Sequence, residues 1–197
     1  MNNALSDSAL DQLFRNARSY NGFRDEPVTM DQLHAIWNPM RSGPTSANSL
    51  PARIAWCAST DAKAQLATCV LPTNVEKILS APVTAIIGMD TEFFELLPEL
   101  FPHADARSWF SGNTELSEAT AFRNATLQGA YLVLAARALG LDTGPISGFD
   151  HAAVDAAFFS GQPSVRSNFI ATIGYGDPAS IFARRPPPPV ARRNRIG

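Results

Sequence analysis

The longest helical pattern in the chain runs from Thr114 to Gly140, and it limits the possible folds more than any other segment. Apolar and small residues recur there at helical spacing, at Leu116, Ala119, Phe122, Thr126, Gly129, Leu132, Val133, Ala136 and Leu139. A helix of roughly 26 residues is about 39 Å long. The small residues Ala121, Ala125, Gly129 and Ala130 would let a second helix approach closely. We therefore expect a fold built around this helix, either in the core of a dimer or at the centre of a monomer.

The charge content of the chain is low. Charged residues make up 17% and hydrophobic residues 45% of the 197 residues, whereas an average globular domain is about 25% charged. Much of the surface must therefore be less polar than usual, and burial against a second subunit would explain it. The 18 acidic and 16 basic residues nearly balance, and no long basic stripe precedes the extreme C-terminus. We do not expect nucleic acid to be the main partner.

The cysteine content and the N-terminal residues indicate where in the cell the protein is expected to lie. Cys57 and Cys69 could pair in principle, but two cysteines without an obvious signal peptide are typical of reduced, buried thiols. The first residues lack a positive segment followed by an apolar run. No window reaches the roughly 18 uninterrupted apolar residues that a membrane span needs. We expect a cytoplasmic protein with no membrane partner.

Shorter patterns predict the other elements. Polar caps before apolar residues place helix starts at Ser6–Ser8, Thr29, Asp61, Thr73 and Asp150. In the second helix we expect the inner face to consist of Met30, Leu33, Ile36, Trp37 and Met40. Compact apolar runs at 54–58, 82–88 and 169–176 predict strands. This order predicts an α+β domain with a small sheet against helices.

Residues 1–185 are expected to form one domain, because a chain of this length suits a single core. Between 90 and 113 the pattern loosens, and phenylalanines and Trp109 are scattered among prolines and polar residues. We interpret this segment as a functional insertion or a lid that is too short to carry its own core. Residues 186–197 begin with four prolines and contain several arginines, which predicts an extended Pro/Arg-rich tail.

A glycine-bracketed turn, Gly144 to Phe149, follows the long helix. Two glycines and a proline leave little side chain between the backbone and a ligand, so backbone N–H groups could approach a flat ring or a phosphate. The usual phosphate cradles, the hydrolase GxSxG motif and metal-ligand spacing are all missing from the sequence. Any chemistry is therefore expected to belong to a cofactor, and no metal site is expected.

Four polar clusters could surround a phosphorylated ligand: Arg18–Ser19, the loop Gly43–Asn48, Asn74 with Lys77, and Arg184–Arg185. Arginines form charge-assisted hydrogen bonds with phosphate oxygens. Asn74 and Lys77 lie one helical turn apart. The amide could hydrogen-bond to the polar edge of a heterocycle, and the positive charge could stabilise negative charge that develops on it. Each cluster alone also fits an ordinary solvated surface.

Taken in order, these motifs resemble the FMN-dependent nitroreductase family as far as about Arg185. Arg18, Ser19 and Asn21 are similar to its N-terminal phosphate-binding segment, although many relatives have a basic residue in place of Asn21. The loop with Pro44, Thr45, Ser46 and Asn48 resembles one that the other subunit supplies. Asn74 and Lys77 resemble the pair at the flavin pyrimidine edge. Pro145, Ile146, Ser147 and Gly148 resemble the turn at flavin N5, and Gly174–Gly176 with Arg184 and Arg185 resembles the closing signature.

The resemblance is strongest to the subgroup that contains malonic semialdehyde reductase of pyrimidine catabolism. It is carried by 101–110, 120–124 and 144–150. The same subgroup contains proteins known only as NAD(P)H nitroreductases. The resemblance implies that His103, Arg107 and Trp109 are candidates for binding a substrate carboxylate. A surface loop held together by its aromatic residues is the alternative.

The resemblance further implies a nitroreductase-like fold with a mostly antiparallel sheet, and an intertwined homodimer with FMN in two interface sites. NADH or NADPH would give hydride to flavin N5, and a small aldehyde such as malonic semialdehyde would then be reduced to 3-hydroxypropanoate. Lys77, Asn74 and the Ser147 N–H are the implied catalytic groups. A nitro or quinone reductase, a non-catalytic FMN-binding dimer and a dimer that has lost the site remain alternatives.

Overall fold

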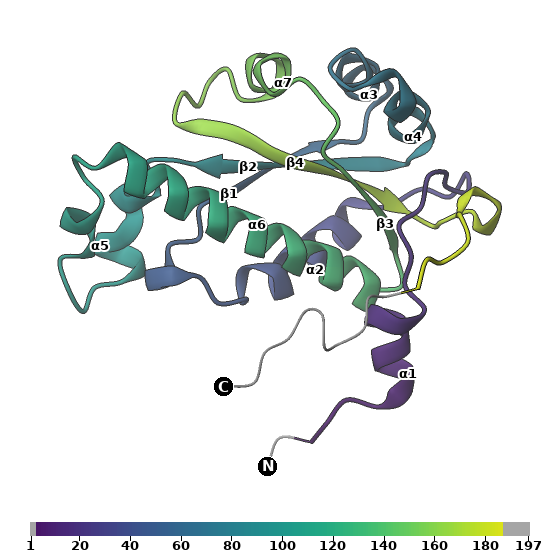
Figure 1. The fold of residues 1–197 in the computed structure, drawn as a ribbon, viewed down its shortest axis with the longest axis horizontal. Coiled ribbons are helices and arrows are strands. Elements are labelled where there is room, and N and C mark those ends of the chain that lie inside the picture. The colour runs from purple at the N-terminus through teal and green to yellow at the C-terminus, as the bar shows by residue number, and fades with distance from the viewer. Residues whose placement is uncertain (1–2, 187–197) are drawn as a thin grey trace.

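A four-stranded antiparallel sheet in the order β1-β2-β4-β3 lies at the centre of the fold (Figure 1). We describe residues 3–186 of a computed structural model. The strands are β1 (Ala52–Cys57), β2 (Val83–Asp90), β3 (Asp142–Ile146) and β4 (Val165–Gly174). The prediction of a small antiparallel sheet in an α+β fold is confirmed.

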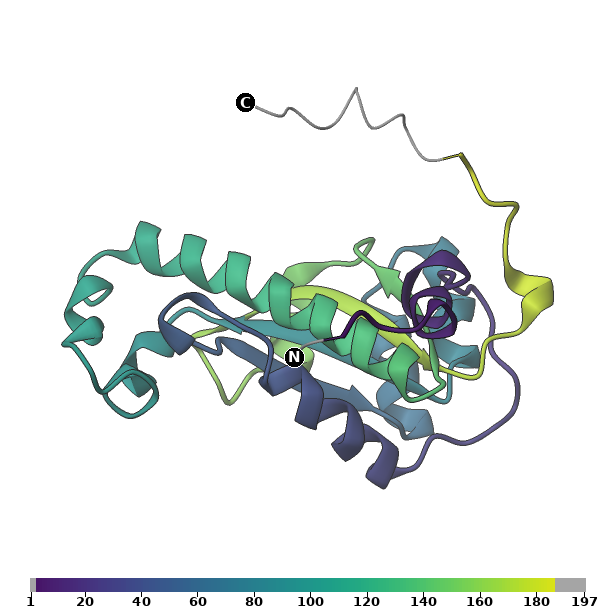
Figure 2. The ribbon, with the colours of Figure 1, turned by 90° about the horizontal axis from the view of Figure 1, so that it is seen from below.

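The helices form a layer on each face of the sheet. They are α1 (Asp7–Leu10), which continues as a π-helical turn over Asp11–Arg15, α2 (Met30–Arg41), α3 (Thr60–Ala67), α4 (Val75–Ser80), α5 (Leu97–Leu100), α6 (Thr114–Ala138) and α7 (His151–Phe158). Short 3-10 turns lie at Ser46–Asn48, Pro72–Asn74, Phe93–Leu96, Ala106–Trp109 and Pro178–Ser180. Helices α2 and α6 cover one face, and α3, α4 and α7 cover the other (Figures 1 and 2). Among the described helices, none is long and apolar enough to cross a bilayer.

Alternating strand residues supply a core to each helical layer. Ala85 and Ile87 of β2 pack towards α2 and α6, whereas Ile86 packs towards α3 and α7. Both cysteines are free and buried within the second of these layers. Burial raises the pKa of the Cys57 thiol to about 12 because the thiolate would lose its hydration. These thiols therefore behave as apolar core groups, as the sequence predicts.

The long helix is confirmed, and most predicted helix starts are correct to within two residues. Thr29 forms a full capping box with Gln32, and Asp150 accepts a hydrogen bond from Ala153 N–H at 3.1 Å. The helix predicted after Thr73 is present, but Thr73 does not cap it: Thr73 lies inside the 3-10 turn Pro72–Asn74, and Asn74 precedes α4 without a side-chain cap bond.

The predicted inner face of α2 is too wide. Leu33, Ile36 and Met40 are buried, but Met30 is 57% exposed and Trp37 is 38% exposed. A stripe spaced by three and four residues covers only part of the helix circumference. Met30 and Trp37 lie at the edges of that stripe.

Strand β3 is the main element that sequence reasoning missed. Gly144, Pro145 and Ile146, predicted as part of a turn, pair with β4 instead. Proline cannot donate to a strand ladder and is therefore found mainly on edge strands. Strand β3 is an edge strand, so Pro145 can lie opposite Ala171 without breaking the sheet. The turn itself is confined to the residues after Ile146.

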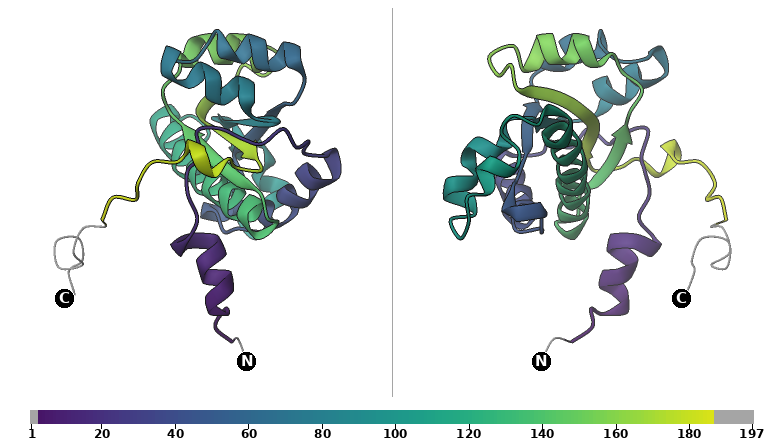
Figure 3. Two further views of the ribbon diagram at one scale, coloured as in Figure 1. Left: turned by 90° about the vertical axis from the view of Figure 1, so that its right-hand side faces the viewer. Right: turned by 60° about the vertical axis from the view of Figure 1, so that its left-hand side comes forward.

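The segment 90–113 extends beyond the sheet as short helical turns around α5 (Figure 3). Phe93, Leu97, Ala106 and Phe110 are buried together, and Ala121 of α6 completes this small cluster. The segment thus packs against the first turns of α6 through its own apolar residues.

Candidate functional site

The N-terminal segment runs along the outer edge of β3. Ser19 forms a bridge with Thr143, and the Tyr20 N–H donates to the Thr143 carbonyl at 3.1 Å. A Cβ on Gly144 would lie 2.4 Å from the Tyr20 carbonyl oxygen. Gly144 is therefore required for the close approach of two backbones rather than for the turn. This approach places Arg18 and Ser19 beside the strand that leads to Ser147.

The turn after β3 is joined to the start of α4. Asn74 Nδ2 donates to the Gly148 carbonyl at 3.0 Å, and the Leu71 N–H donates to the same oxygen at 3.0 Å. A Cβ on Gly148 would lie only 2.9 Å from both Asn74 Nδ2 and the Leu71 side chain. The structure thus brings together Asn74 and the predicted glycine turn.

Several donors at this turn have no partner within residues 3–186. The half-buried Lys77 ammonium forms no hydrogen bond or ion pair there, and the Ser147 and Gly148 N–H groups donate to no protein acceptor. Asn74 Oδ1 also accepts no hydrogen bond within that part of the chain. These groups could receive a ligand that carries both acceptors and a donor.

Arg18 and Arg184 come together from the two ends of the domain. The Arg18 guanidinium donates to the Phe182 carbonyl, and Arg184 Nη2 donates to the Ala17 carbonyl at 2.9 Å. Asn21 Nδ2 donates to the Ser180 carbonyl at 2.9 Å, so its amide joins the same two segments. Neither arginine pairs with a carboxylate among the described residues. Two uncompensated guanidinium groups at one place favour an anion.

Arg185, the last predicted phosphate-binding residue, follows Arg184 in the chain. It lies exposed beside Arg184.

The predicted loop with Pro44, Thr45, Ser46 and Asn48 lies elsewhere in the subunit. Its Pro44 carbonyl accepts a hydrogen bond from Tyr131 of α6 at 2.9 Å, and Asn48 Nδ2 donates to the Leu100 carbonyl of the insertion at 2.9 Å. The loop is therefore on the α6 side of the sheet, whereas Asn74 is on the α4 side (Figures 1 and 2). Within one subunit the structure does not bring this loop to Asn74 and Ser147.

The three candidate substrate-binding residues lie in the insertion. His103 contacts Phe101 edge-on with ring centroids 5.7 Å apart, and Phe101 contacts Trp109 at 6.0 Å. Arg107 forms two hydrogen bonds with Glu95, at 2.8 and 2.7 Å. This interaction lowers the pKa of the Glu95 carboxyl. The Arg107 charge is thus already neutralised by a residue of the same segment.

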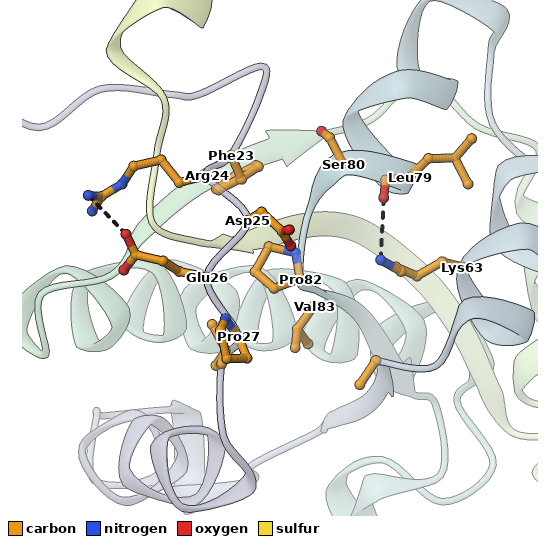
Figure 4. Close-up of a pocket in the computed structure, with 12 residues that line it drawn as sticks. Phe23, Arg24, Asp25, Glu26, Pro27, Lys63, Leu79, Ser80, Pro82 and Val83 are labelled. Atoms are coloured by element: carbon orange, nitrogen blue, oxygen red, sulfur yellow. Dashed lines mark hydrogen bonds and ion pairs between the residues drawn. The ribbon is translucent and has the colours of Figure 1, made fainter.

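A cavity of about 590 Å³ contains none of the predicted site residues. It lies between the segment 23–28 and the end of α4 (Figure 4). Three of its charged groups are used internally, because Arg24 pairs with Glu26 at 3.0 Å and Lys63 Nζ donates to the Leu79 and Ala81 carbonyls. Within residues 3–186, no group of three or more His, Cys, Asp or Glu side chains could hold a metal ion.

Sequence reasoning missed the side chains that hold the loop 44–52. Asn124, Gln128 and Tyr131 of α6 contact it through hydrogen bonds. The available signal was the pair of amides four residues apart on a helix whose other inward positions are small or apolar. Polar residues at such positions must be hydrogen-bonded when buried.

Comparison with known proteins assigns the fold and the family. Residues 14–175 match the sequence model of the Nitroreductase family. The chain is 59% identical over 182 residues to a Burkholderia lata protein named "Putative NADH dehydrogenase/NAD(P)H nitroreductase". The matched region covers 92% of this chain and 93% of that protein. A Xanthomonas oryzae protein of the same name is 54% identical over 186 residues, with 94% of each chain covered.

Solved structures with the same fold are more distant in sequence. A Bacillus subtilis nitroreductase structure superposes with a TM-score of 0.89 at 20% identity, covering 98% of this chain and 100% of that one. An Exiguobacterium sibiricum nitroreductase in complex with FMN has a TM-score of 0.85 at 19% identity, with both chains fully covered. The fold, the match over most of the chain and the close relatives agree, and the chain belongs to the nitroreductase family.

Proposed function

We propose that this protein is an FMN-dependent NAD(P)H oxidoreductase that works as a homodimer. The observation that carries the proposal is the set of positive charges and free donors beside β3 and the turn that follows it, none of which pairs with a carboxylate among the described residues. Arg18 and Arg184 supply positive charge at one end, and the Ser147 N–H and Lys77 supply donors at the other. This arrangement fits a ligand with a phosphate group and a polar heterocycle.

The residues present fit FMN in detail. Arg18 and Arg184 would hold its phosphate, with Ser19, Asn21 and Arg185 beside them. Asn74 and Lys77 would bind the pyrimidine edge, and Gly148 leaves the space in which the Asn74 amide lies against the turn. The chemistry that FMN would supply here is hydride transfer between NADH or NADPH and the second substrate.

The protein would contribute orientation and electrostatics. The Lys77 ammonium would stabilise negative charge that develops at the pyrimidine edge, and Asn74, fixed by its bond to the Gly148 carbonyl, would orient the ring. The Ser147 N–H would donate to N5 at the site of hydride transfer. Pro145 and Ile146 shape the backbone that presents this donor.

A second subunit would complete the site. The exposed face of α6 carries Leu116, Phe122 and Leu127, with Phe122 55% exposed, and apolar grooves run along this face. Surfaces of this kind mark protein interfaces. Burial of α6 against its counterpart would bring Pro44, Thr45, Ser46 and Asn48 of one subunit to the flavin of the other. The free thiols support a reducing compartment such as the cytoplasm.

For the second substrate we propose a small aldehyde such as malonic semialdehyde, reduced to 3-hydroxypropanoate as in pyrimidine catabolism. Arg107 and His103 would bind its carboxylate, which requires Arg107 to exchange Glu95 for the substrate. Trp109, which is half-exposed beside Phe101, favours the alternative of a flat nitroaromatic or quinone substrate. In that case Arg107 would keep its bond to Glu95.

Anaerobic addition of NADH and NADPH to the purified yellow protein tests the proposed activity. We expect the flavin absorbance band to bleach with at least one of the two. Steady-state turnover with malonic semialdehyde, a nitroaromatic and a quinone then separates the candidate substrates. A yellow protein that neither nicotinamide bleaches would be a flavin-binding dimer without reductase activity.

Replacing Arg184 with glutamine should weaken FMN binding about tenfold to 100-fold, since a charge-assisted hydrogen bond contributes about 1.5–3 kcal/mol. Equilibrium dialysis of the flavin-free protein against FMN measures the dissociation constant. Arg166→Gln is the matched control, because Arg166 donates to the Pro163 and Val165 carbonyls on another part of the surface. Equal FMN affinity of the Arg184 variant and the wild type would remove Arg184 from phosphate binding.

A further inference from the structure

Three side chains on one side of α6 hold both ends of the loop 44–52. Asn124 Oδ1 accepts from the Ser46 N–H at 2.8 Å, and Gln128 Oε1 accepts from the Ala52 N–H at 2.8 Å. One turn further, the Tyr131 hydroxyl donates to the Pro44 carbonyl at 2.9 Å. The three positions are spaced by four and three residues, so they lie in a row along the helix.

The loop between these contacts has an unusual backbone. Ala47, Asn48 and Leu50 have φ values of 51°, 51° and 40°, in the left-handed region. Residues with a Cβ rarely adopt this conformation, and they keep it only when surrounding contacts hold them there. The loop has one internal side-chain bond, from the Leu50 N–H to Thr45 Oγ1 at 3.3 Å. Two backbone bonds also lie inside it, from the Asn48 N–H to the Thr45 carbonyl at 3.1 Å and from the Ser49 N–H to the Ser46 carbonyl at 3.0 Å. These bonds shape the turn, and the contacts from α6 fix the turn and both ends of the loop to the rest of the fold.

The two amides on α6 are buried, and their hydrogen bonds offset the free-energy cost of removing them from water. Asn124 is 2% exposed and Gln128 is 1% exposed. Asn124 Nδ2 donates to the Thr120 carbonyl at 2.8 Å, which orients the amide so that its oxygen points to Ser46. A buried amide is tolerated when its polar atoms are paired. Asn124 is thus oriented by its own helix to accept from the loop.

We infer that Asn124 is a positioning residue that holds the loop 44–52 in the conformation in which Thr45, Ser46 and Asn48 meet FMN. This inference rests on the proposed function, because it assigns the loop a cofactor to contact. Asn124 itself does not touch the cofactor. Gln128 and Tyr131 fix the two ends of the loop, and Asn124 fixes the turn that begins at Ser46.

Hydrogen exchange of the flavin-free protein tests the restraint without the cofactor. Asn124→Ala should raise the exchange rate of the peptide 44–52 about tenfold or more, because the Ser46 N–H loses its acceptor. Asn124→Asp keeps an oxygen that can accept from the Ser46 N–H but loses the Nδ2 donor to the Thr120 carbonyl, so it should retain part of the protection. Ser117→Ala is the matched control, since it removes a buried side-chain bond on α6, to the Thr114 carbonyl at 3.0 Å, that does not involve the loop.

FMN affinity measured on the same variants links the loop to the cofactor. We expect Asn124→Ala to raise the FMN dissociation constant about tenfold, Asn124→Asp to raise it less, and Ser117→Ala to change it less than about threefold. The melting temperature of each flavin-free variant is recorded alongside. A loss of affinity that follows the melting temperature across all three variants would indicate a structural role only and would overturn the inference.

A second pair of variants tests the contact itself. Ser46→Pro removes the N–H, and Thr45 is extended (φ −133°, ψ 158°), which suits a following proline at the first position of a helical turn. Ser46→Ala removes the hydroxyl but keeps the N–H. Asn124→Ala should therefore weaken FMN binding in the Ser46→Ala background and have little further effect in the Ser46→Pro background.

The outcomes distinguish the restraint on the loop 44–52 from its link to FMN. Unchanged exchange in Asn124→Ala would overturn the restraint, whatever the cofactor. Faster exchange with unchanged FMN affinity would overturn the link to the cofactor and leave the proposed function intact. A wild-type protein that binds no FMN would overturn the proposed function and this link together, while the exchange data would still report on the restraint.

Discussion

Replacing Lys77 with methionine is expected to leave FMN bound and to slow its reduction by NAD(P)H about 100-fold or more. Removal of a single preorganised donor at a developing negative charge typically costs a factor of about 100 to 1,000 in rate. The Lys77 ammonium is half-buried and has no partner among residues 3–186, so its charge is available to the ligand. Arg18 and Arg184, at the phosphate end, would keep the cofactor in place.

Anaerobic stopped-flow absorbance with both nicotinamides measures this rate, and gel filtration followed by a spectrum measures retained flavin. The control is Lys63→Met, the other lysine of the chain. Lys63 Nζ donates to the Leu79 and Ala81 carbonyls at the end of α4, so its loss should lower stability without slowing reduction comparably. If Lys77→Met is reduced as fast as the wild type, Lys77 has no part in the mechanism.

Gly144→Ala is expected to destabilise the protein by about 3 kcal/mol, because overpacking against rigid neighbours costs up to about that amount. The new Cβ would lie 2.4 Å from the Tyr20 carbonyl oxygen and 2.6 Å from Thr172 Oγ1. Neither neighbour can retreat easily, since the Tyr20 backbone is bonded to Thr143 and Thr172 Oγ1 donates to the Gly144 carbonyl. For a chain of this size the loss corresponds to a drop in melting temperature of roughly 6–12 °C.

Thermal unfolding of the flavin-free protein gives this number. Gly161→Ala serves as the matched control because a Cβ there meets nothing within 4 Å and its φ is not in the left-handed region. Since the Gly144 variant also pushes Ser19 away from β3, its FMN affinity should fall as well. Equal melting temperatures for the two variants would mean that the backbone at Tyr20 does not hold Gly144 closely.

Local patterns predicted most of the fold. The Thr29 capping box and the periodicity of α6 depend on neighbours within one or two turns, so a single sequence reveals them. Strand β3 was missed because Gly144 and Pro145 indicate a turn locally, and only the pairing with β4, about 28 residues later, makes them a strand. Its place at the sheet edge is what makes Pro145 acceptable there.

The candidate site was predictable as separate pieces. Arg18, Asn74, Lys77 and Arg184 stood out as residue types suited to a phosphorylated ring, and the glycine turn indicated backbone access. Their mutual contacts could not be read from spacing, because Asn74 meets Gly148 and Arg184 meets Ala17 across 74 and 167 residues of chain. The reason for each glycine also differs from the prediction, since Gly144 admits the Tyr20 backbone and Gly148 admits Asn74.

By itself the sequence determined the helices outside the segment 90–113, three of the four strands and the types of side chain available for a cofactor, because these depend on local propensity and on the chemistry of single residues. Only the tertiary structure decided that β3 closes the sheet, that Arg18 and Arg184 lie together, and that Asn124 of α6 bonds to the loop 44–52. Those outcomes depend on contacts between segments distant in the chain, and each is decided by the space and the hydrogen-bond partners that the rest of the fold leaves at that point.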